Sequence, residues 1–454
     1  MDNEFEQFLS EIRELLDRED WPRLHDVLDL MRIQDIARAL MALDEAQIPR
    51  VFDALPRGRK VDVFSYLEPS CQYRLLAGMS PRAARHVLSE LAPDDLTALL
   101  EDLPPDEVRR LLRLLPFGAV RRALTLLGYP EHSVGRLMTP EFVTVRPDWT
   151  VTDSLAHIRE HSARGETVNV ILVVDEDRHL MHTLPLKHFI LRRATDPVEK
   201  LPPGPAVSIN AQADRTEAAR LIQHYDIEVL PVVDDDNVVL GIVTVDDVMD
   251  VVEEETTEDF HKFGSVGALN LSLRDAGLSL LYRKRIGWLL VLVALNLVGG
   301  AIMAGFAETI EALVVLVVFL PLIIAGGGNA GAQSATLMVR ALATGDVEAR
   351  DWLRLWGREL FVSVALGLTM GLAIALLGFW RGGAELALLV AVAMTLVVTM
   401  GSLVGMMLPL ILQRLRLDPA TASVPLVTSA ADIVGILLYF SLAVALLELP
   451  GTGG

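Results

Sequence analysis

The stretch TSAADIVGILLYFSLAVALL (428–447) decides the architecture of the C-terminal half of the chain. Nineteen of its twenty residues are apolar, small or hydroxyl-bearing, and the other is Asp432. A bilayer core needs about 20 residues of helix, so this stretch is long enough to cross a membrane. A carboxylate at the centre of such a helix costs about 3 kcal/mol, and acids that persist there normally line a polar path. Asp432 is therefore a candidate functional residue.

Four uncharged runs precede this segment and extend the same pattern towards the N-terminus. The five predicted spans cover 286–307, 312–339, 360–380, 386–413 and 419–447, the last interrupted only by Asp432. Each run is long enough to span a bilayer, the longer ones with tilt or with an end in the interface. The sequence predicts an α-helical five-span transmembrane domain over residues 271–454.

Basic residues flank alternate ends of these runs, which sets the orientation of the bundle. The other side of the membrane holds one basic residue, Arg381, with Glu308, Glu311 and Glu385. The pattern predicts a multi-pass protein of the plasma (inner) membrane with a cytosolic N-terminus and an outside C-terminus. The nine basic residues of the cytosolic side are Arg283, Lys284, Arg285, Arg340, Arg350, Arg354, Arg358, Arg414 and Arg416.

The charge of the chain is concentrated in its first part. Residues 271–454 contain 11 basic and 11 acidic side chains, so residues 1–270 hold the whole net charge of −20. An acidic soluble region argues against a nucleic-acid partner, which requires a basic face. The chain opens MDNEFEQFLS, with no early apolar run, so we expect no signal peptide. The single cysteine, Cys71, suits a reducing cytosol.

The predicted membrane half contains neither histidine nor cysteine. Zinc, copper and iron are usually held by thiolate or imidazole, whereas magnesium, calcium and manganese take oxygen ligands. The same absence disfavours a membrane metalloprotease, and a single intramembrane aspartate cannot form an aspartyl dyad. The sequence therefore favours transport of a hard divalent cation over an enzymatic activity.

The second span ends in the glycine-rich stretch PLIIAGGGNAGAQSATLMVRA (321–341). Its glycines permit close helix contact, and Asn329 and Gln333 share one helix face. Asn329 lies roughly 16 Å from the cytosolic Arg340, and Asp432 lies roughly 14 Å from the cytosolic end of its span. An acid, an amide and Gly328 are thus expected at similar depth, as an oxygen-lined cation site. A plain packing seam is the competing interpretation.

Residues 31–127 carry a strict repeat of 12 residues. Pro69, Pro81, Pro93 and Pro105 follow two residues after four of the repeated apolar positions. Proline suits the first turn of a helix, so the repeat predicts short helices stacked into an all-α superhelical N domain over 1–130. A docking surface and a plain structural domain remain equally open. The repeated positions are Met31, Leu43, Leu55, Leu67, Met79, Leu91, Leu103, Leu115 and Leu127.

A weaker duplication occupies residues 131–252. LMTPEFVTV (137–145) and ILVVDEDRHLMHTL (171–184) are echoed by LPPGPAVSI (201–209) and VLPVVDDDNVVLGIVTVDDVMDVV (229–252). Each copy reads strand, helix, strand, turn, strand, helix, which resembles an α/β tandem pair of CBS domains. Such pairs as a class often bind adenine nucleotides and dimerise, so the resemblance implies a possible ATP ligand.

An acidic connecting helix is predicted over 246–270. Its stretch DDVMDVVEEETTEDFHKFG (246–264) places eight acids in fourteen residues without one base. Several are like-charge neighbours three or four residues apart, which mildly destabilises a helix. A run of this kind is usually a solvated face. Between a regulatory module and a membrane domain it also invites divalent cations, with Asp418 of the loop QRLRLDPA (413–420) as a further ligand.

Together these elements resemble the MgtE-type magnesium channels across nearly the whole chain. The order of domains agrees, and the closest motifs are PLIIAGGGNAGAQSATLMVRALATGD (321–346) and SAADIVG (429–435). The resemblance implies a homodimer with its pore on the dimer axis, in which Asp432 of each subunit binds magnesium. Asn329 and Gly328 would line the pore. The acidic connecting helix would act as a plug.

The resemblance also implies a cytosolic magnesium sensor built from spread carboxylates. Magnesium would bridge the acidic faces of the N domain, the CBS domains and the plug helix and hold the pore closed. The implied sensor ligands are Asp94, Asp95, Glu217, Asp226, Asp247, Asp250, Glu255, Glu258, Asp259 and Asp418.

Two other readings stay open from the sequence. One is a proton-coupled divalent cation transporter in which Asp432 titrates. In the other, the soluble half is chiefly a nucleotide sensor. Oxygen ligands alone also leave calcium, manganese, cobalt and nickel as permeant ions.

Overall fold

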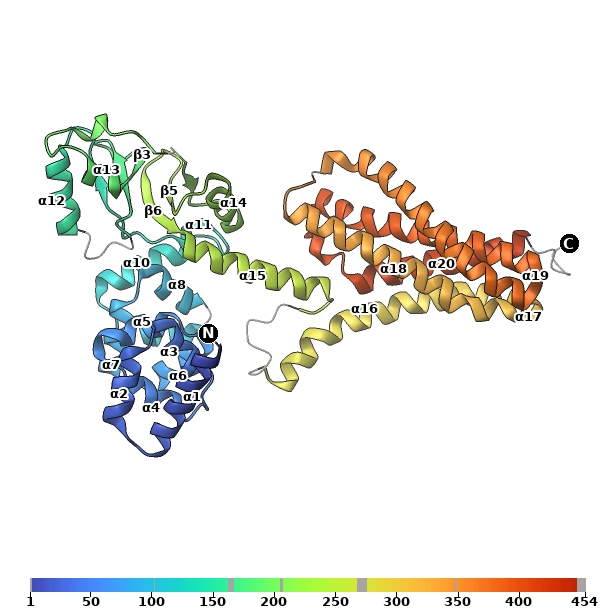
Figure 1. Cartoon of the computed structure of the whole chain (residues 1–454), viewed down its shortest axis with the longest axis horizontal. Helices are drawn as coiled ribbons and strands as arrows, with labels where there is room; N and C mark the ends of the chain where they lie inside the picture. The colour runs from blue at the N-terminus through green and yellow to red at the C-terminus, as the bar shows by residue number, and fades with distance from the viewer. Residues whose placement is uncertain are drawn as a thin grey trace. The chain divides into compact units, whose positions relative to one another are not determined.

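The structure is a computed structural model that describes residues 2–101, 103–161, 167–204, 207–267, 276–347 and 349–446. The chain folds into two compact units, Met1–Glu253 and Glu254–Gly454. The boundary lies inside helix α15 (Val245–Phe263), which therefore contributes to both units (Figure 1). The fold class predicted from the sequence, a helical N domain, an α/β tandem domain and an apolar helical region, is confirmed.

The first unit begins with a stack of short helices. The proline repeat is confirmed, because α6, α7, α8 and α9 each start at one of the four repeated prolines. The missing amide of proline costs nothing at the first helical position. The ten helices described here are α1 (Asp2–Asp17), α2 (Trp21–Leu30), α3 (Ile33–Met41), α4 (Ile48–Ala54), α5 (Lys60–Ser65), α6 (Pro69–Gly78), α7 (Pro81–Glu90), α8 (Pro93–Glu101), α9 (Pro105–Leu112) and α10 (Phe117–Leu127).

The apolar positions of the 12-residue repeat form part of the core of this stack. Met31, Leu43, Leu55 and Leu67 are buried, each just beyond the end of a short helix. Leu91 and Leu115 are buried as well, whereas Met79, Leu103 and Leu127 are partly buried against the same apolar core. The repeat therefore supplies a core contact at each step of the stack.

The second part of this unit holds two three-stranded sheets of the same topology. In each sheet the first strand runs parallel to the second, and the second pairs antiparallel with the third. The strands are β1 (Thr144–Val145), β2 (Val170–Val174), β3 (Leu180–Pro185), β4 (Ile209–Asn210), β5 (Val229–Val233) and β6 (Val239–Thr244). The helices are α11 (Val134–Leu137), α12 (Val151–His161), α13 (Leu186–Leu191), α14 (Arg215–Tyr225) and α15.

The two sheets share a core, as expected of a duplicated domain. Leu172 of β2 packs in the same apolar cluster as Val229 of β5. The turn before β3 bridges the turn before β6 at His179 and Val238. The repeated order of strands and helices that the sequence predicts is confirmed in both copies.

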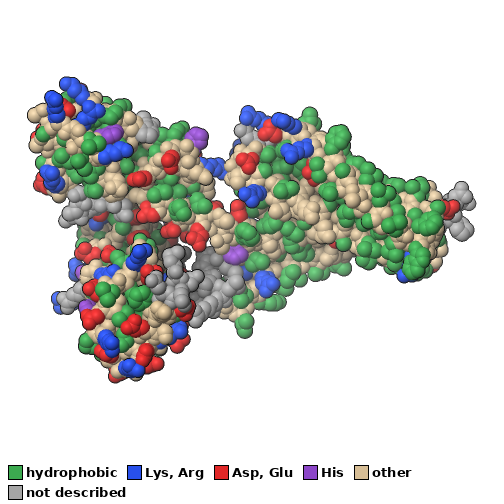
Figure 2. All heavy atoms as spheres, in the orientation of Figure 1, with side chains coloured by type: hydrophobic (Ala, Val, Ile, Leu, Met, Phe, Trp, Pro, Cys, Tyr) green, Lys and Arg blue, Asp and Glu red, His purple; other side chains and the backbone are tan. Residues whose placement is uncertain are grey.

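The second unit is a bundle of long apolar helices, and hydrophobic side chains cover most of its visible surface in Figure 2. Four described helices are long and apolar enough to cross a membrane. Besides the end of α15, the α-helices of this unit are α16 (Leu278–Gly305), α17 (Ala307–Ala312), α18 (Val315–Ala343), α19 (Trp352–Arg414) and α20 (Val424–Leu446).

Helix α19 is two spans joined end to end. Gly382 and Gly383 leave the helical conformation, and Gly383 takes a φ of +76° that favours glycine. The two halves then pack antiparallel, because Gly371 lies against the backbone of Ala391. The described helices thus supply five spans, as predicted. The last one begins at Val424 instead of 419, since Asp418 caps a short 3-10 turn over Pro419–Thr421.

Glycines bring α18 and the second half of α19 into backbone contact. A Cβ on Gly401 would lie 2.3 Å from the Gly327 carbonyl oxygen, and one on Gly405 would lie 2.0 Å from that of Gly331. The second pair lies four residues beyond the first on both helices, so the two helices run parallel. We call this contact of Gly327 and Gly331 with Gly401 and Gly405 the glycine seam. Small residues at this spacing are a common basis of close helix packing in membranes.

We expect Gly405→Ala to force these helices apart. An added methyl group cannot fit 2.0 Å from a carbonyl oxygen, and overpacking of this kind costs about 1–3 kcal/mol. The thermal unfolding midpoint in detergent will fall. Gly357→Ala in the same helix is the matched control, because nothing lies within 4 Å of its added Cβ. Equal midpoints for the two variants would contradict the prediction.

Candidate functional site

Next to the glycine seam, Gly328 of α18 lies opposite Asp432 of α20. A Cβ on Gly328 would lie 3.4 Å from Asp432 Oδ1 and 3.5 Å from Thr428 Cβ. Any larger side chain at position 328 would fill the space beside the carboxylate. With α20 beginning at Val424, Asp432 lies roughly 12 Å along that helix. The structure therefore brings together an acid and a glycine that are 104 residues apart in the sequence.

The carboxylate of Asp432 is half-buried in the apolar bundle. In the described ranges it makes neither a hydrogen bond nor an ion pair. An ionised carboxylate in an apolar bundle is strongly destabilised unless a cation, water or a proton donor compensates it. The geometry leaves the carboxylate oxygens available to a ligand.

The amides of α18 lie on the surface of the single chain. Asn329 and Gln333 are both exposed, on the same helix face, although the surrounding helix is apolar. Amide groups are costly in contact with lipid, so this face requires water or another protein surface against it. A face of this kind can line an aqueous path or pack against a second copy of the bundle.

The end of the bundle predicted to lie outside is held by aromatic contacts. The Tyr439 hydroxyl donates to the Leu316 carbonyl oxygen at 3.0 Å, and the rings of Phe306 and Phe440 stack at 5.4 Å. The first contact joins α18 to α20, and the second holds the residue between α16 and α17 against α20. Glu308 and Glu311 of α17 are exposed, as an acidic entrance requires.

At the end of this unit that the sequence predicts to face the cytosol, Lys262 bridges two of the predicted sensor acids. Its Nζ lies 2.8 Å from Glu258 Oε1 and 2.7 Å from Asp418 Oδ2. The buried hydroxyls of Ser265 and Ser423 hydrogen bond at 2.6 Å beside this pair. Burial lowers the pKa of Lys262, but the hydrogen bonds that its ammonium donates to Asp418 and Glu258 outweigh this effect and raise the pKa above its ordinary value. The end of α15 is thereby fastened to the loop before α20.

Asp259 completes this acidic group. Burial, followed by the negative charge of Asp418, raises the pKa of Asp259 above its ordinary value of 3.8. A raised pKa means that ionising this carboxyl group opposes the folded arrangement. A cation beside Asp259 would relieve the opposition, which makes this end of α15 a candidate cation-binding surface.

We therefore expect the docking of the α15 end to weaken as pH rises in the absence of divalent cations. The contribution of Asp259 to the free energy of docking is most favourable below pH 3.8, where its carboxyl group is protonated in both the docked and the undocked state. This contribution is lost as the pH rises through the raised pKa of Asp259 in the docked state. Protection of the amides of Glu254–Phe263 in hydrogen exchange, corrected for the intrinsic pH effect, will decrease over that window. In Asp259→Asn the decrease should be absent; a variant that still shows it would contradict the assignment.

Of the other predicted sensor acids, Glu255 lies in the second unit and the rest lie in the first unit. Asp247 starts α15, where its Oδ2 accepts a hydrogen bond from the Thr244 hydroxyl at 2.6 Å. Asp226 ends α14 in the left-handed conformation, with φ of 50°. Across the described residues, no group of three or more His, Cys, Asp or Glu is placed to hold a metal ion. Asp94 is buried, whereas Asp95, Glu217, Asp226 and Asp250 are exposed; Asp247 and Glu255 are half-buried.

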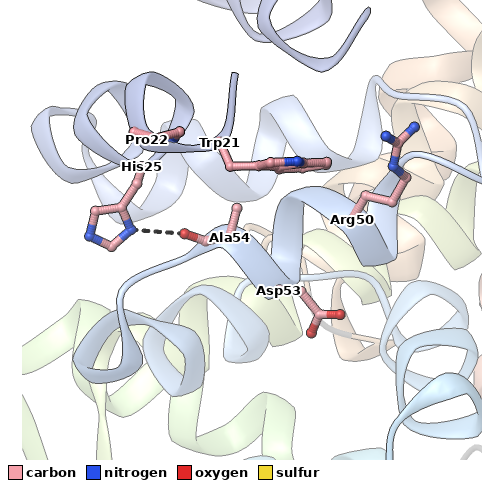
Figure 3. A pocket seen from close by; sticks show the side chains of 6 residues that line it. All are labelled: Trp21, Pro22, His25, Arg50, Asp53 and Ala54. Atoms are coloured by element: carbon pink, nitrogen blue, oxygen red, sulfur yellow. Dashed lines mark hydrogen bonds between the residues drawn. The ribbon is translucent and has the colours of Figure 1, made fainter. Parts of the chain in front are cut away.

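A surface hollow of about 590 Å³ also lies on the N-terminal helices (Figure 3). Trp21, His25 and Arg50 line it; the Arg50 guanidinium lies 5.1 Å from the Trp21 ring, and His25 Nδ1 lies 3.0 Å from the Ala54 carbonyl oxygen. Asp53 is the single acid in its lining. A base beside an aromatic ring does not suit a divalent cation, so this hollow is not part of the site.

The sequence reading missed Lys262 and Glu359, both of which form hydrogen bonds between elements far apart in the chain. Lys262 is the first base after eight acids, and Glu359 is the last charge before the run 360–380. These positions at the edges of charged and apolar runs could have been noticed in the sequence. The residues that bind them could not, because they are distant in the chain.

The fold defines a class of protein: a polytopic membrane protein with a helical domain and a tandem α/β domain ahead of its apolar bundle. Comparison with known families makes the class specific. The model of the divalent cation transporter domain MgtE matches residues 320–442, the MgtE intracellular N domain matches 31–132, and CBS domains match 134–193 and 198–254. The chain belongs to the MgtE family.

Curated relatives match this chain over most of their length. The magnesium transporter MgtE of Thermus thermophilus is 42% identical over 320 residues, which cover 70% of this chain and 71% of the relative. The magnesium transporter MgtE of Bacillus subtilis is 34% identical over 323 residues, 71% of each chain.

Solved structures match the soluble part. A crystal structure of the cytosolic domain of the Mg2+ channel MgtE in complex with ATP is 34% identical, with a TM-score of 0.51. The match covers 54% of this chain and 99% of that one. The soluble part of a magnesium transporter matches with the same TM-score at 26% identity, covering 55% and 99% of the two chains.

Proposed function

We propose that this chain is a magnesium channel that imports Mg2+ across the plasma membrane and is closed by cytosolic Mg2+. The observation that carries the proposal is the carboxylate of Asp432, which forms no ion pair with any described residue and faces Gly328 in a bundle without histidine or cysteine. Magnesium prefers oxygen ligands and keeps several of its waters, so it binds through one or two carboxylates. Relatives that cover most of this chain are named magnesium transporters.

A homodimer would complete the site. One chain offers a single carboxylate, whereas two chains about a symmetry axis offer a pair, and pores of homo-oligomers form on such axes. The exposed face of Asn329 and Gln333 supports this arrangement, since it needs water or protein against it. Asn329 and Gly328 would line the pore beside Asp432.

The membrane potential would drive the import. Moving a divalent ion across 100 mV supplies ~4.6 kcal/mol, about twice the value for one elementary charge. The exposed Glu308 and Glu311 would raise the local concentration of cations at the outer entrance. Hydrated magnesium would then bind at Asp432 and pass to the cytosol. The chain would have no enzymatic role.

The cytosolic parts would form the gate. We divide them into a helical N domain (1–130), tandem CBS domains (131–252) and an acidic plug helix (246–270), ahead of a transmembrane domain (271–454). Residues 268–270 lie outside the described residues. Magnesium bound to acids of the N domain, the CBS domains and the plug would hold the pore closed, and its loss would leave the carboxylates to repel one another. The two states differ in bound cations, as a ligand-driven switch requires.

The CBS domains would bind ATP as a second regulator. This inference rests on the ATP complex of the related cytosolic domain. The N-terminus would be cytosolic and the C-terminus outside, as the basic flanks of the spans indicate.

The deciding experiment is single-channel recording in planar bilayers with Mg2+ varied on the cytosolic side. A magnesium current that closes as internal Mg2+ rises supports the proposal. The alternative, a proton-coupled transporter with Asp432 as the titrating group, predicts flux that collapses when a pH gradient is dissipated. Flux unaffected by the pH gradient would exclude it.

A further inference from the structure

Glu359 is an acid inside the bundle that the proposed transport path does not use. It lies in the first half of α19, half-buried, and its Oε1 accepts hydrogen bonds from the hydroxyls of Ser334 at 2.8 Å and Ser402 at 2.5 Å. Both serines are buried. Among the described residues Glu359 forms no ion pair. The carboxylate is therefore held by two neutral donors from two other helical segments.

Those two serines belong to the glycine seam. Ser334 follows Gly331 by three residues in α18, and Ser402 follows Gly401 directly in the second half of α19. Contacts between glycines are dispersion contacts, which bring helices close without a strong preference for one register. A hydrogen bond to a carboxylate is directional and stronger than one between neutral groups. Glu359 supplies the directional contact that the seam lacks.

We propose that Glu359 is a positioning residue that fixes the register of α18, so that Gly328 stands beside Asp432. The inference rests on the proposed role of Asp432 as the pore ligand. Ser334 lies six residues beyond Gly328, roughly 9 Å along one continuous helix. Because the helix is continuous, a slip of α18 at Ser334 is passed on to Gly328 and Asn329.

The test separates the length of this side chain from its charge. Both serines donate to the same oxygen, and an amide oxygen also has two lone pairs, so Glu359→Gln keeps both hydrogen bonds without the charge. Glu359→Asp keeps the charge but is one methylene too short to reach both serines. A positioning role predicts that the aspartate variant is impaired and the glutamine variant is not. A role in attracting cations or binding protons predicts the reverse.

The measurements are Mg2+ uptake into proteoliposomes, competition by Ca2+, and the thermal midpoint in detergent. In Glu359→Asp we expect the half-saturating Mg2+ concentration to rise about tenfold, as misplacement by a fraction of an ångström produces at an oriented site. Discrimination against Ca2+ should fall with it. Glu359→Gln should stay within about twofold of the unmodified chain on each measure. The double variant Ser334→Ala/Ser402→Ala should reproduce the aspartate result.

Three outcomes would overturn the proposal: a glutamine variant impaired as much as the aspartate one, an aspartate variant with unchanged affinity and selectivity, or a normal double serine variant. A loss of maximal rate and midpoint with unchanged affinity and selectivity would indicate a purely structural contact and would overturn it as well. The proposed pore role of Asp432 is tested separately, because it stands or falls on variants of Asp432. The midpoints of the Glu359 variants report on helix register whichever way that test ends.

Discussion

Replacing Asp432 by Ala will reduce magnesium uptake into liposomes to background. Two unit charges 4 Å apart attract by about 4 kcal/mol at an effective dielectric constant of 20, and a divalent ion is attracted more strongly. Loss of that attraction weakens binding by at least about a hundredfold, since 1.4 kcal/mol corresponds to a factor of ten. Without the carboxylate, the other side chain that the structure places against Gly328 is Thr428, which carries no charge.

Asp432→Asn refines the same test, because it keeps the size and removes the charge. The amide fits the space beside Gly328, so a folding defect is not expected from it. Glu385→Gln is the matched control, since Glu385 is an exposed acid of the same unit outside this site. Its uptake should equal that of the unmodified chain. Magnesium flux that persists in both Asp432 variants would remove Asp432 from the pore.

Neutralising Glu255, Glu258 and Asp259 together will leave the channel open at internal magnesium concentrations that close the unmodified protein. These acids lie along the last turns of α15, where Glu258 shares Lys262 with Asp418 and where burial already opposes the charge of Asp259. Removing three carboxylates removes the charges that a divalent cation would bridge. Coupling between an effector and a distant gate is typically about 5- to 150-fold, and a shift of that size is expected in half-closing magnesium.

The control for this variant lies in the same helix. Asp246, Glu253 and Glu254 are exposed acids of α15 outside the predicted sensor set, and neutralising them changes the net charge by the same three units. If the effect is one of total charge, both triple variants will shift closure equally. If closure is unchanged in the first triple variant, the acidic run is a solvated face and the sensor lies elsewhere. Single-channel open probability against internal magnesium measures all three proteins.

The sequence was most informative where a property depends on local composition. The five uncharged runs predicted the spans, and the 12-residue repeat with its prolines predicted the starts of α6 to α9. Solvation in a bilayer and the conformation of proline act on a residue and its immediate neighbours. Asp432 could be identified from the sequence for the same reason, because a single carboxylate in a long apolar run is unusual whatever residues lie around it in the fold.

The ends of helices were less predictable. The fifth span begins at Val424 because Asp418 accepts a hydrogen bond from the Ala420 amide and holds a short 3-10 turn. The third and fourth spans merge into α19, since a non-helical turn at Gly382 and Gly383 replaces a loop. Both features depend on local hydrogen bonds and backbone angles that composition does not encode.

Only the tertiary structure decided which residues meet. Gly328 lies against Asp432, and Lys262 joins Glu258 to Asp418 across 156 residues of chain. Glu359 accepts hydrogen bonds from Ser334 and Ser402 because glycines let two helices approach to backbone contact. By itself the sequence determined the spans, the helical repeat and the position of Asp432, since each follows from the solvation or the backbone conformation of one segment. The register between helices decided the partners of that acid, because register follows from the packing of surfaces that are distant in sequence and meet only when the chain is folded.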